Sequence, residues 1–229
     1  MTDLNLDNDT SVYFIEKIKK IDNPLILELG VNKGGSTSIF LKYINKHGGK
    51  LYSIDINDCK NIIKTEKFKN LNTDVWNFLK SNDLNIKYIL KEFPKIKDGI
   101  DLLYIDSYHD ETHVKNILAT WFEYVNKNGY IFFDDTESLI YRKSKNFSLS
   151  VNNDAIDKFV KKFFYNNSHQ VSYIKYFKGS GLSEFKKKTE KGTKPILEDR
   201  IWNYNNLVAF IYLFVKKVFY RLKSKDKLP

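Results

Sequence analysis

The sequence predicts an α/β protein built on a Rossmann-like, doubly wound and mostly parallel seven-stranded sheet, followed by a C-terminal helical extension. Short apolar runs alternate with segments of helical period along most of the chain, a pattern typical of βα units. A glycine-rich turn joins the first apolar run to a helix, as in nucleotide-binding sheets. The 229 residues are 42% hydrophobic and 29% charged, which suits one full-sized globular domain with an appendage.

The expected strands are short runs rich in Leu, Ile, Val, Tyr and Phe that end at polar or glycine residues. In chain order they are residues 25–29, 51–56, 75–80, 101–106 and 130–134, then a hairpin of residues 171–177 and 182–187. Helices are expected where apolar residues recur at helical spacing. They are residues 11–20, 36–45, a helix between the second and third strands, and residues 85–93, 111–126 and 153–164. The expected domains are the sheet domain, residues 1–187, and a basic linker with an amphipathic helix, residues 188–229.

The positive charge of the chain is concentrated near its C-terminus. The net charge is +10, but residues 186–229 alone hold twelve basic and four acidic residues. The body of the protein is therefore nearly neutral, and no basic face for a nucleic acid is indicated. We expect no nucleic-acid partner.

The C-terminal segment carries nine consecutive apolar residues, 207–215, followed by a stretch that includes Lys216, Lys217 and Arg221. Nine residues are about half of the roughly 20 needed to span a bilayer. The composition instead predicts peripheral contact of residues 207–223 with an anionic membrane surface. The alternatives are that this helix packs on the protein's own sheet or on a second subunit of a homo-oligomer.

Two features indicate the compartment. The single cysteine, Cys59, forms no internal disulfide, and the polar, acidic start MTDLNLDNDT lacks the apolar run of a signal peptide. We expect a cytoplasmic protein, with the inner face of the membrane as the place where residues 207–223 would bind.

The turn after the first strand and the end of the second strand predict a nucleoside site. Gly30, together with Gly34 or Gly35, permits positive φ angles and close approach of a ligand, and the helix starting at Ser36 offers free N–H groups to a carboxylate. Asp55 ends the second strand, 25 residues after Gly30, where it can accept ribose hydroxyls. An adenosine-type ligand is therefore indicated. A topological turn and a helix-capping aspartate are the purely structural alternatives.

Acidic residues follow two later strands of the predicted sheet. Asp106 ends the fourth strand, and Asp134 and Asp135 end the fifth, so three carboxylates converge on one crevice. Such hard oxygen donors suit Mg²⁺, Mn²⁺ or Ca²⁺, although a helix cap and a turn would use the same residues. His109 lies just past the fourth strand and is the candidate general base, with a structural histidine as the alternative.

The stretches ELGVNKGGST, SIDI, WNFLKSND, IDLLYIDSYHDETHV and NGYIFFDD resemble, in order, the motifs of class I S-adenosylmethionine-dependent methyltransferases. The resemblance covers roughly residues 24–187 and is greatest to the group of macrolide sugar O-methyltransferases and cephalosporin-hydroxylase-like proteins. Residue 32 is Asn, so the dinucleotide motif G-x-G-x-x-G is not matched, which favours a methyltransferase over a dehydrogenase.

The resemblance implies a role for each matching position. The methionine end of the cofactor would be held by Gly30, Gly34, Gly35 and Ser36, with Glu28 supporting their loop, while Asp55 would bind the ribose and Asn82 and Asp83 the adenine. In the metal-dependent O-methyltransferases that this chain resembles, the positions of Asp106, Asp134 and Asp135 bind Mg²⁺, which draws in the acceptor's hydroxyl oxygens.

The motif after the fourth strand departs from the family. Ser107 and Tyr108 stand where relatives have Gly and Asp, so an acidic residue that relatives use as a base is absent. This leaves His109, beside Asp106, or the metal ion to activate the acceptor. His47, His113 and His169 are assigned no role.

The sequence thus indicates an O-methyltransferase that uses S-adenosylmethionine, assisted by Mg²⁺, on a hydroxyl of a saccharide or other small acceptor. Two alternatives stay open. One is a non-catalytic, membrane-peripheral protein that keeps the nucleoside pocket. The other is a hydroxylase-like member of the same group.

Overall fold

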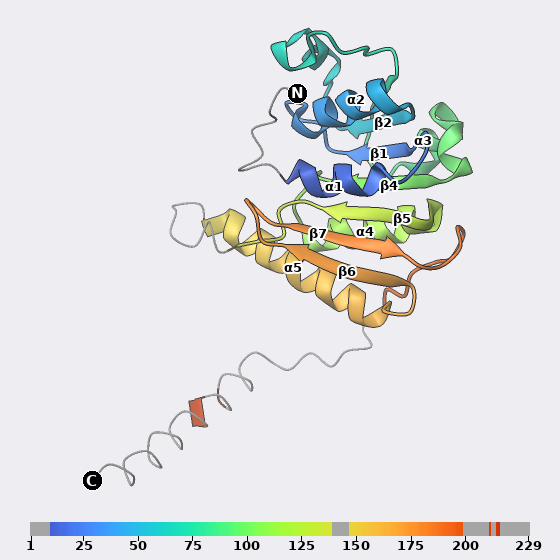
Figure 1. Ribbon diagram of the computed structural model, residues 1–229. Helices are drawn as coiled ribbons and strands as arrows, with labels where there is room; N and C mark the ends of the chain where they lie inside the picture. Colours follow the sequence, from blue (N-terminus) through green and yellow to red (C-terminus); the bar gives the residue numbers. More distant parts are fainter. Residues whose placement is uncertain (1–9, 139–146, 199–210, 212–213, 216–229) are drawn as a thin grey trace. The chain divides into compact units, whose positions relative to one another are not determined.

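The fold is a seven-stranded sheet in the order β3-β2-β1-β4-β5-β7-β6 (Figure 1). The computed structural model describes residues 10–138, 147–198, 211, 214 and 215. The strands are β1 (Leu25–Leu29), β2 (Lys50–Asp55), β3 (Trp76–Lys80), β4 (Ile100–Ile105), β5 (Val125–Phe133), β6 (Val171–Tyr176) and β7 (Leu182–Lys187). Strands β1 to β5 pair in parallel, and β7 is antiparallel to both of its neighbours. The predicted mostly parallel, Rossmann-like sheet is confirmed.

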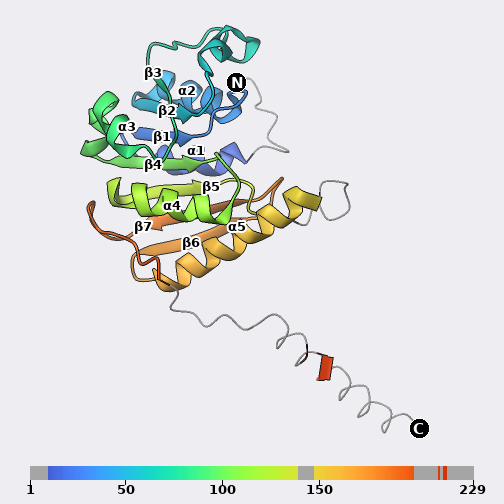
Figure 2. The same cartoon turned by 180° about the vertical axis from the view of Figure 1, so that it is seen from behind.

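Helices cover both faces of this sheet. They are α1 (Ser11–Ile18), α2 (Gly35–His47), α3 (Ile86–Glu92), α4 (Glu111–Trp121) and α5 (Phe147–Asn166). One apolar core joins α1 and α2 to alternate strand residues such as Ile26 and Tyr104. The other joins α3, α4 and α5 to the opposite strand faces through residues such as Leu27 and Ile105. Figure 1 shows the side of α1, and Figure 2, from behind, the side of α4. With both faces buried, the strands read as continuous apolar runs.

The prediction of a helix between the second and third strands is wrong. Two short 3₁₀ turns, Lys60–Lys64 and Glu66–Phe68, occupy this connection. Of their residues, Phe68 alone is buried, so no apolar stripe exists that could hold a longer amphipathic helix on the sheet.

Helix α4 also ends earlier than expected, at Trp121, and β5 begins at Val125. Lys187, which is fully buried, donates from Nζ to the carbonyl oxygens of Phe122 and Val125, each at 2.9 Å. This contact stabilises the sharp change from helix to strand, because it supplies a donor to carbonyls that a helix end leaves unpaired.

The compact unit that contains the sheet runs to Leu197, beyond the expected boundary at residue 187. The N–H of Ile196 donates to Oδ1 of Asn167 at 2.7 Å, and Nζ of Lys191 donates to the carbonyl of Lys97 at 2.8 Å. The expected helix over residues 207–223 lies outside the described residues, except for positions 211, 214 and 215. Within the described part of the chain, no helix is long and apolar enough to cross a membrane.

Candidate active site

A cavity of about 530 Å³ opens at the carboxyl ends of β1 to β4. The strand order reverses between β1 and β4, which is the place where doubly wound sheets bind ligands. The volume of the cavity is in the range of small-molecule sites. The cavity is lined by Gly30, Asn32, Ile54, Asp55, Ile56, Asn57, Ser81, Asn82, Asp83, Asp106, Ser107, Tyr108, His109 and His113.

Gly30 lets the ends of β1 and β4 approach each other at the base of this cavity. Its φ angle is +95°, and a Cβ at this position would lie 2.0 Å from the carbonyl oxygen of Asp106. No side chain fits such a gap. Gly34 has a positive φ of +70°, but its Cβ would meet Ile62 and Phe68 at 2.7 Å. Gly34 therefore packs against the 3₁₀ segment, and neither it nor Gly35 lines the cavity.

Glu28 is fully buried and holds the start of α2 against the sheet. Its carboxylate accepts hydrogen bonds from Ser36 Oγ at 2.6 Å, Thr37 Oγ1 at 2.8 Å and Ser53 Oγ at 2.6 Å. Burial raises the pKa of Glu28 to about 7, although the three hydroxyl donors oppose the increase. Glu28 has the supporting position that the sequence predicts, while the hydroxyl of Ser36 is directed to Glu28.

Asp55 lies at the end of β2 and binds the loop after β1. Oδ2 accepts the N–H groups of Val31 at 2.9 Å and Asn32 at 3.1 Å, and Oδ1 accepts that of Asn57 at 2.8 Å. Burial alone would raise the pKa of Asp55, but these backbone donors outweigh it and hold the pKa below its ordinary value. The Cys59 thiol also hydrogen-bonds to this carboxylate, so Asp55 fixes the loop after β1 and the residues that follow β2.

Asn82 and Asp83 line the end of the cavity beyond β3. Asn82 Oδ1 accepts the N–H of Leu84 at 2.8 Å, and the carbonyl of Asp83 accepts Trp121 Nε1–H at 2.9 Å. His113, to which the sequence assigned no role, places Nε2 3.0 Å from Oδ2 of Asp83. A signal for it exists in the sequence. Asp110 caps α4, accepting the N–H of His113 at 3.1 Å, so His113 lies in the first turn of a helix that begins at the cavity.

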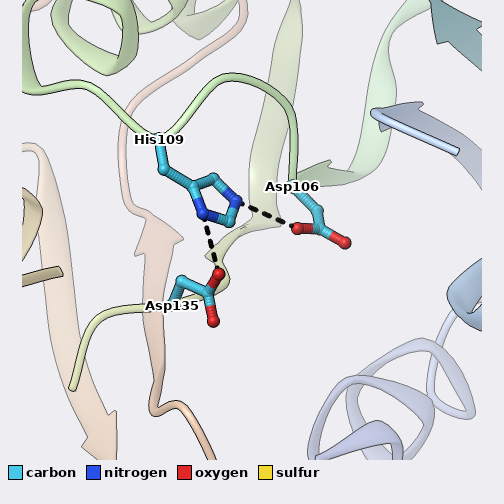
Figure 3. Close-up of side chains that lie close together, drawn as sticks. All are labelled: Asp106, His109 and Asp135. Carbon is cyan, nitrogen blue, oxygen red and sulfur yellow. Dashed lines mark hydrogen bonds and ion pairs between the residues drawn. The ribbon is translucent and has the colours of Figure 1, made fainter. Parts of the chain in front are cut away.

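Asp106, His109 and Asp135 form a cluster at the other end of the site (Figure 3). His109 lies between the two carboxylates, with Nδ1 2.8 Å from Asp135 Oδ2 and Nε2 3.3 Å from Asp106 Oδ1. One ligand atom from each of the three residues lies within 4.8 Å of the others.

Asp134, expected as a third carboxylate ligand, is absent from this group of the described residues. Its Oδ2 accepts the hydroxyl of Tyr104 at 2.7 Å, and its Oδ1 accepts the N–H of Asp135 at 2.9 Å. The reason is geometric. Strand β5 ends at Phe133 and Asp135 has a positive φ of 54°, so the backbone turns here and the two side chains do not face the same point. His109 takes the place of Asp134.

The charges of the cluster are coupled. Hydrogen bonds that His109 donates to Asp106 and Asp135 raise the pKa of His109 to about 10, so the imidazole is protonated at neutral pH in this arrangement. Burial raises the pKa of Asp106. Burial and the charges of Asp106 and Asp135 raise the pKa of Asp134 to about 7. His109 as placed therefore has no free lone pair for a general base, whereas Asp106 faces the cavity as an acceptor.

The donor chemistry of the cluster suits a hard divalent cation. The two carboxylates supply the oxygen ligands that Mg²⁺ and Mn²⁺ prefer, while both ring nitrogens of His109 are bonded to these carboxylates. The set differs from the two histidines and one carboxylate of non-haem iron oxygenases, which counts against the hydroxylase-like alternative. The cavity also fits an adenosine-type cofactor, since its volume is adequate and its two ends carry different polar groups.

Comparison with known proteins agrees with this geometry. Residues 27–136 match the family model described as a methyltransferase domain. The match covers 110 of the 229 residues. The matched residues of this domain run from β1 through Asp106, His109 and Asp135, and so include the strand ends that form the cavity.

One known protein is similar to this chain in sequence, and several solved structures are similar to it in fold. The uncharacterized protein R132 of Acanthamoeba polyphaga mimivirus is 36% identical over 142 residues, which are 59% of this chain and 61% of that protein; the chain thus spans about three fifths of this curated relative. The structure of S-adenosylhomocysteine-bound Podospora anserina methyltransferase PaMTH1 has a TM-score of 0.60 at 16% identity, covering 78% of each chain. The methyltransferase MycE of the mycinamycin biosynthetic pathway, in complex with Mg and S-adenosylhomocysteine, has a TM-score of 0.54 at 13% identity, covering 81% of this chain and 51% of that one. At these identities the structures show a shared methyltransferase fold.

Proposed function

We propose that this protein is an S-adenosylmethionine-dependent O-methyltransferase that acts on a hydroxyl of a saccharide or other small acceptor with the help of a divalent cation, Mg²⁺. One observation carries the proposal. A single cavity has nucleoside-type polar groups at one end, Asp55 and Asp83, and the Asp106–His109 cluster at the other. PaMTH1 and MycE, whose structures contain S-adenosylhomocysteine, support this choice of cofactor.

Different residues of the cavity would bind the cofactor and the cation. Gly30 keeps the base of the cavity open to the methionine part, and Asp55, which lines the cavity, would accept a ribose hydroxyl. Asp106 and Asp135 would hold the cation, and His109 would join them only after it loses a proton and one of its two carboxylate contacts. When bound, Mg²⁺ lowers the pKa of an acceptor hydroxyl. Vicinal hydroxyls chelate a cation well, which favours a saccharide as the acceptor.

The transfer forms an O–CH₃ bond and breaks the S–CH₃ bond of the sulfonium, releasing S-adenosylhomocysteine and the proton of the hydroxyl. Asp106 is the group in contact with the cavity that can take this proton, because its carboxyl has a raised pKa and faces the ligand space. His109 holds Asp106 and Asp135 together through its two ring nitrogens. In-line placement of the hydroxyl and the sulfonium supplies most of the acceleration.

Calorimetry with S-adenosylmethionine, S-adenosylhomocysteine and NAD tests the cofactor. We expect micromolar binding of the first two and none of NAD, and loss of binding in the Gly30→Val, Asp55→Ala double variant. Undiminished binding in that variant would refute the assignment. Turnover against a panel of glycosides and small polyols, with and without EDTA, tests the reaction. Cofactor binding without methylation of any acceptor would favour the non-catalytic alternative.

A further inference from the structure

The loop that follows β5, residues 134–138, carries Asp135 and is buried although its residues are polar. Thr136, Glu137 and Ser138 are all buried. Burial of polar groups is unfavourable unless they find partners inside the protein. The family match ends at residue 136, whereas the partners of loop 134–138 described below come from α5, β6 and the turn before β7. Parts of the chain beyond the family match therefore hold this loop.

The turn between β6 and β7 reaches loop 134–138. The N–H of Glu137 donates to the carbonyl oxygen of Ser180 at 2.7 Å. Gly181 has a φ of +82°, and a Cβ there would lie 2.4 Å from the Cβ of Glu137, so only glycine permits this approach. The hydroxyl of Ser180 lies 3.5 Å from Asp134 Oδ1 and also hydrogen-bonds to the carboxylate of Asp135. The turn thus contacts a residue of the proposed cation site.

A chain of alternating charges also holds the loop. On β6, Lys175 Nζ lies 3.1 Å from Glu137 Oε2 and 2.7 Å from Oδ1 of Asp157 on α5. Lys161 Nζ, one helical turn further along α5, lies 2.6 Å from Asp157 Oδ2. The side chain of Lys175 is 7% exposed, whereas that of Lys161 is 47% exposed. Lys175 is therefore a buried cation between a carboxylate of the loop and a carboxylate of the helix.

The contact of Lys175 with Glu137 is the one whose loss would move the loop most. Removal of one partner of a buried ion pair is strongly unfavourable, because the remaining charge stays out of water. Without Lys175, the like charges of Glu137 and Asp157 repel each other. Asp157 is held on a helix and Glu137 on a loop, and loops open more readily than helices that pack on the core. The displacement is therefore expected at Glu137, two residues after Asp135.

We propose that Lys175 is a positioning residue that fixes loop 134–138 through Glu137 and thereby holds Asp135 in place for a divalent cation. This inference rests on the proposed function, in which Asp135 is a cation ligand. Groups that orient a ligand from outside are worth about 10–100-fold in metal affinity. The residues that line the cavity include none of residues 134–138, so the cofactor is expected to bind independently of Lys175.

The test measures binding of Mn²⁺ and of S-adenosylhomocysteine separately, by calorimetry on the full chain at constant pH. Lys175→Met is expected to weaken Mn²⁺ binding by about tenfold and to leave S-adenosylhomocysteine binding unchanged. Lys175→Arg keeps the cation and is expected to retain Mn²⁺ affinity within about threefold of the wild type. Lys161→Met removes an exposed cation from the same Asp157 and is the matched control, with both affinities unchanged. A general loss of structure would lower both affinities.

A second measurement needs no metal. Amide hydrogen exchange of the metal-free protein reports the opening of loop 134–138. Exchange in this loop is expected to be about tenfold faster in Lys175→Met than in the wild type, and unchanged in Lys161→Met. Glu137→Gln weakens the same ion pair and leaves the buried cation in place, so it is expected to change both readouts in the same direction even if Lys175→Met does not fold.

The outcomes separate this inference from the proposed function. Unchanged Mn²⁺ affinity in folded Lys175→Met or in Glu137→Gln overturns the inference alone, as do equal losses in Lys175→Met and Lys161→Met. Unchanged exchange of the loop in these Lys175 and Glu137 variants has the same consequence. A wild type that binds S-adenosylhomocysteine but not Mn²⁺ overturns the cation of the proposed function, and the inference with it.

Discussion

The hydroxyl of Tyr104 donates to Oδ2 of Asp134 at 2.7 Å, and this contact separates Asp134 from its neighbour Asp135. Tyr104 is buried on β4, so its hydroxyl needs a partner inside the protein. Asp134 supplies it. The two adjacent carboxylates, which the sequence treats alike, therefore have different roles. Asp135 faces His109, and Asp134 supports the strand ends.

This difference predicts unequal effects on metal binding. Asp135→Asn removes a proposed ligand and is expected to weaken Mn²⁺ binding by about 100-fold or more, whereas Asp134→Asn, an outer partner that can still accept from Tyr104, weakens it by about tenfold at most. Titration of each variant with Mn²⁺ by calorimetry, at constant pH, measures both. A larger loss of Mn²⁺ affinity in Asp134→Asn than in Asp135→Asn would contradict this assignment and support Asp134 as a metal ligand, as the sequence predicts.

Gly30 and Gly35 are expected to respond differently to alanine. Gly30→Ala forces a Cβ to within 2.0 Å of the Asp106 carbonyl at a φ of +95°, and is expected to lower the free energy of unfolding by roughly 2–5 kcal/mol. Gly35→Ala, at the start of α2, meets nothing within 4 Å and stays within about 1 kcal/mol of the wild type. Urea unfolding gives both values, and similar losses at the two positions would contradict the assigned constraint.

The raised pKa of Glu28 predicts how the stability of the protein depends on pH. This pKa is about 7 in the folded protein against 4.5 for the ordinary side chain, so between these values the folded state binds more protons than the unfolded state. The free energy of unfolding therefore falls as pH rises from about 4.5 to 7. The decrease due to this group is on the order of 1–3 kcal/mol.

The Glu28→Gln variant lacks this titration. The free energy of unfolding of the wild type should therefore fall relative to that of Glu28→Gln as pH rises from about 4.5 to 7. Asp134 is present in both proteins, so its titration contributes equally to both. Glu16→Gln, at an exposed position of α1, is the control. Urea midpoints at pH 5, 6, 7 and 8 measure the trend. A difference that does not change with pH would show that Glu28 does not titrate there.

The C-terminal segment carries a prediction that lies outside the described residues. Residues 207–223 combine an apolar run with Lys216, Lys217, Arg221 and Lys223, and each basic residue near an anionic surface contributes on the order of 1 kcal/mol. The full chain should therefore co-sediment with anionic liposomes at low salt and dissociate at high salt. A chain that ends at Leu197, where the sheet unit ends, should not bind. If both stay in the supernatant, the segment serves the fold or a homo-oligomer.

Much of the fold could be predicted because its signals are local. Each buried strand is an apolar run such as residues 25–29, and each long helix has a 3.6-residue apolar period. The positions of Gly30 and Asp55 at strand ends follow from the same pattern, since carboxyl ends of parallel strands share one edge. The connection at residues 56–75 could not be predicted in this way, because its few apolar residues are compatible with a helix or with isolated turns.

Several contacts of the site join residues that are far apart in the chain. The sequence by itself determined an α/β sheet, a glycine turn after β1 and acidic residues at the ends of β2, β4 and β5. Only the tertiary structure brought His113 to Asp83, 30 residues away, and turned Asp134 toward Tyr104, also 30 residues away. The physical reason is that side-chain direction just past a strand end depends on how the backbone turns there and on the neighbouring strand, and neither is visible in the order of residues.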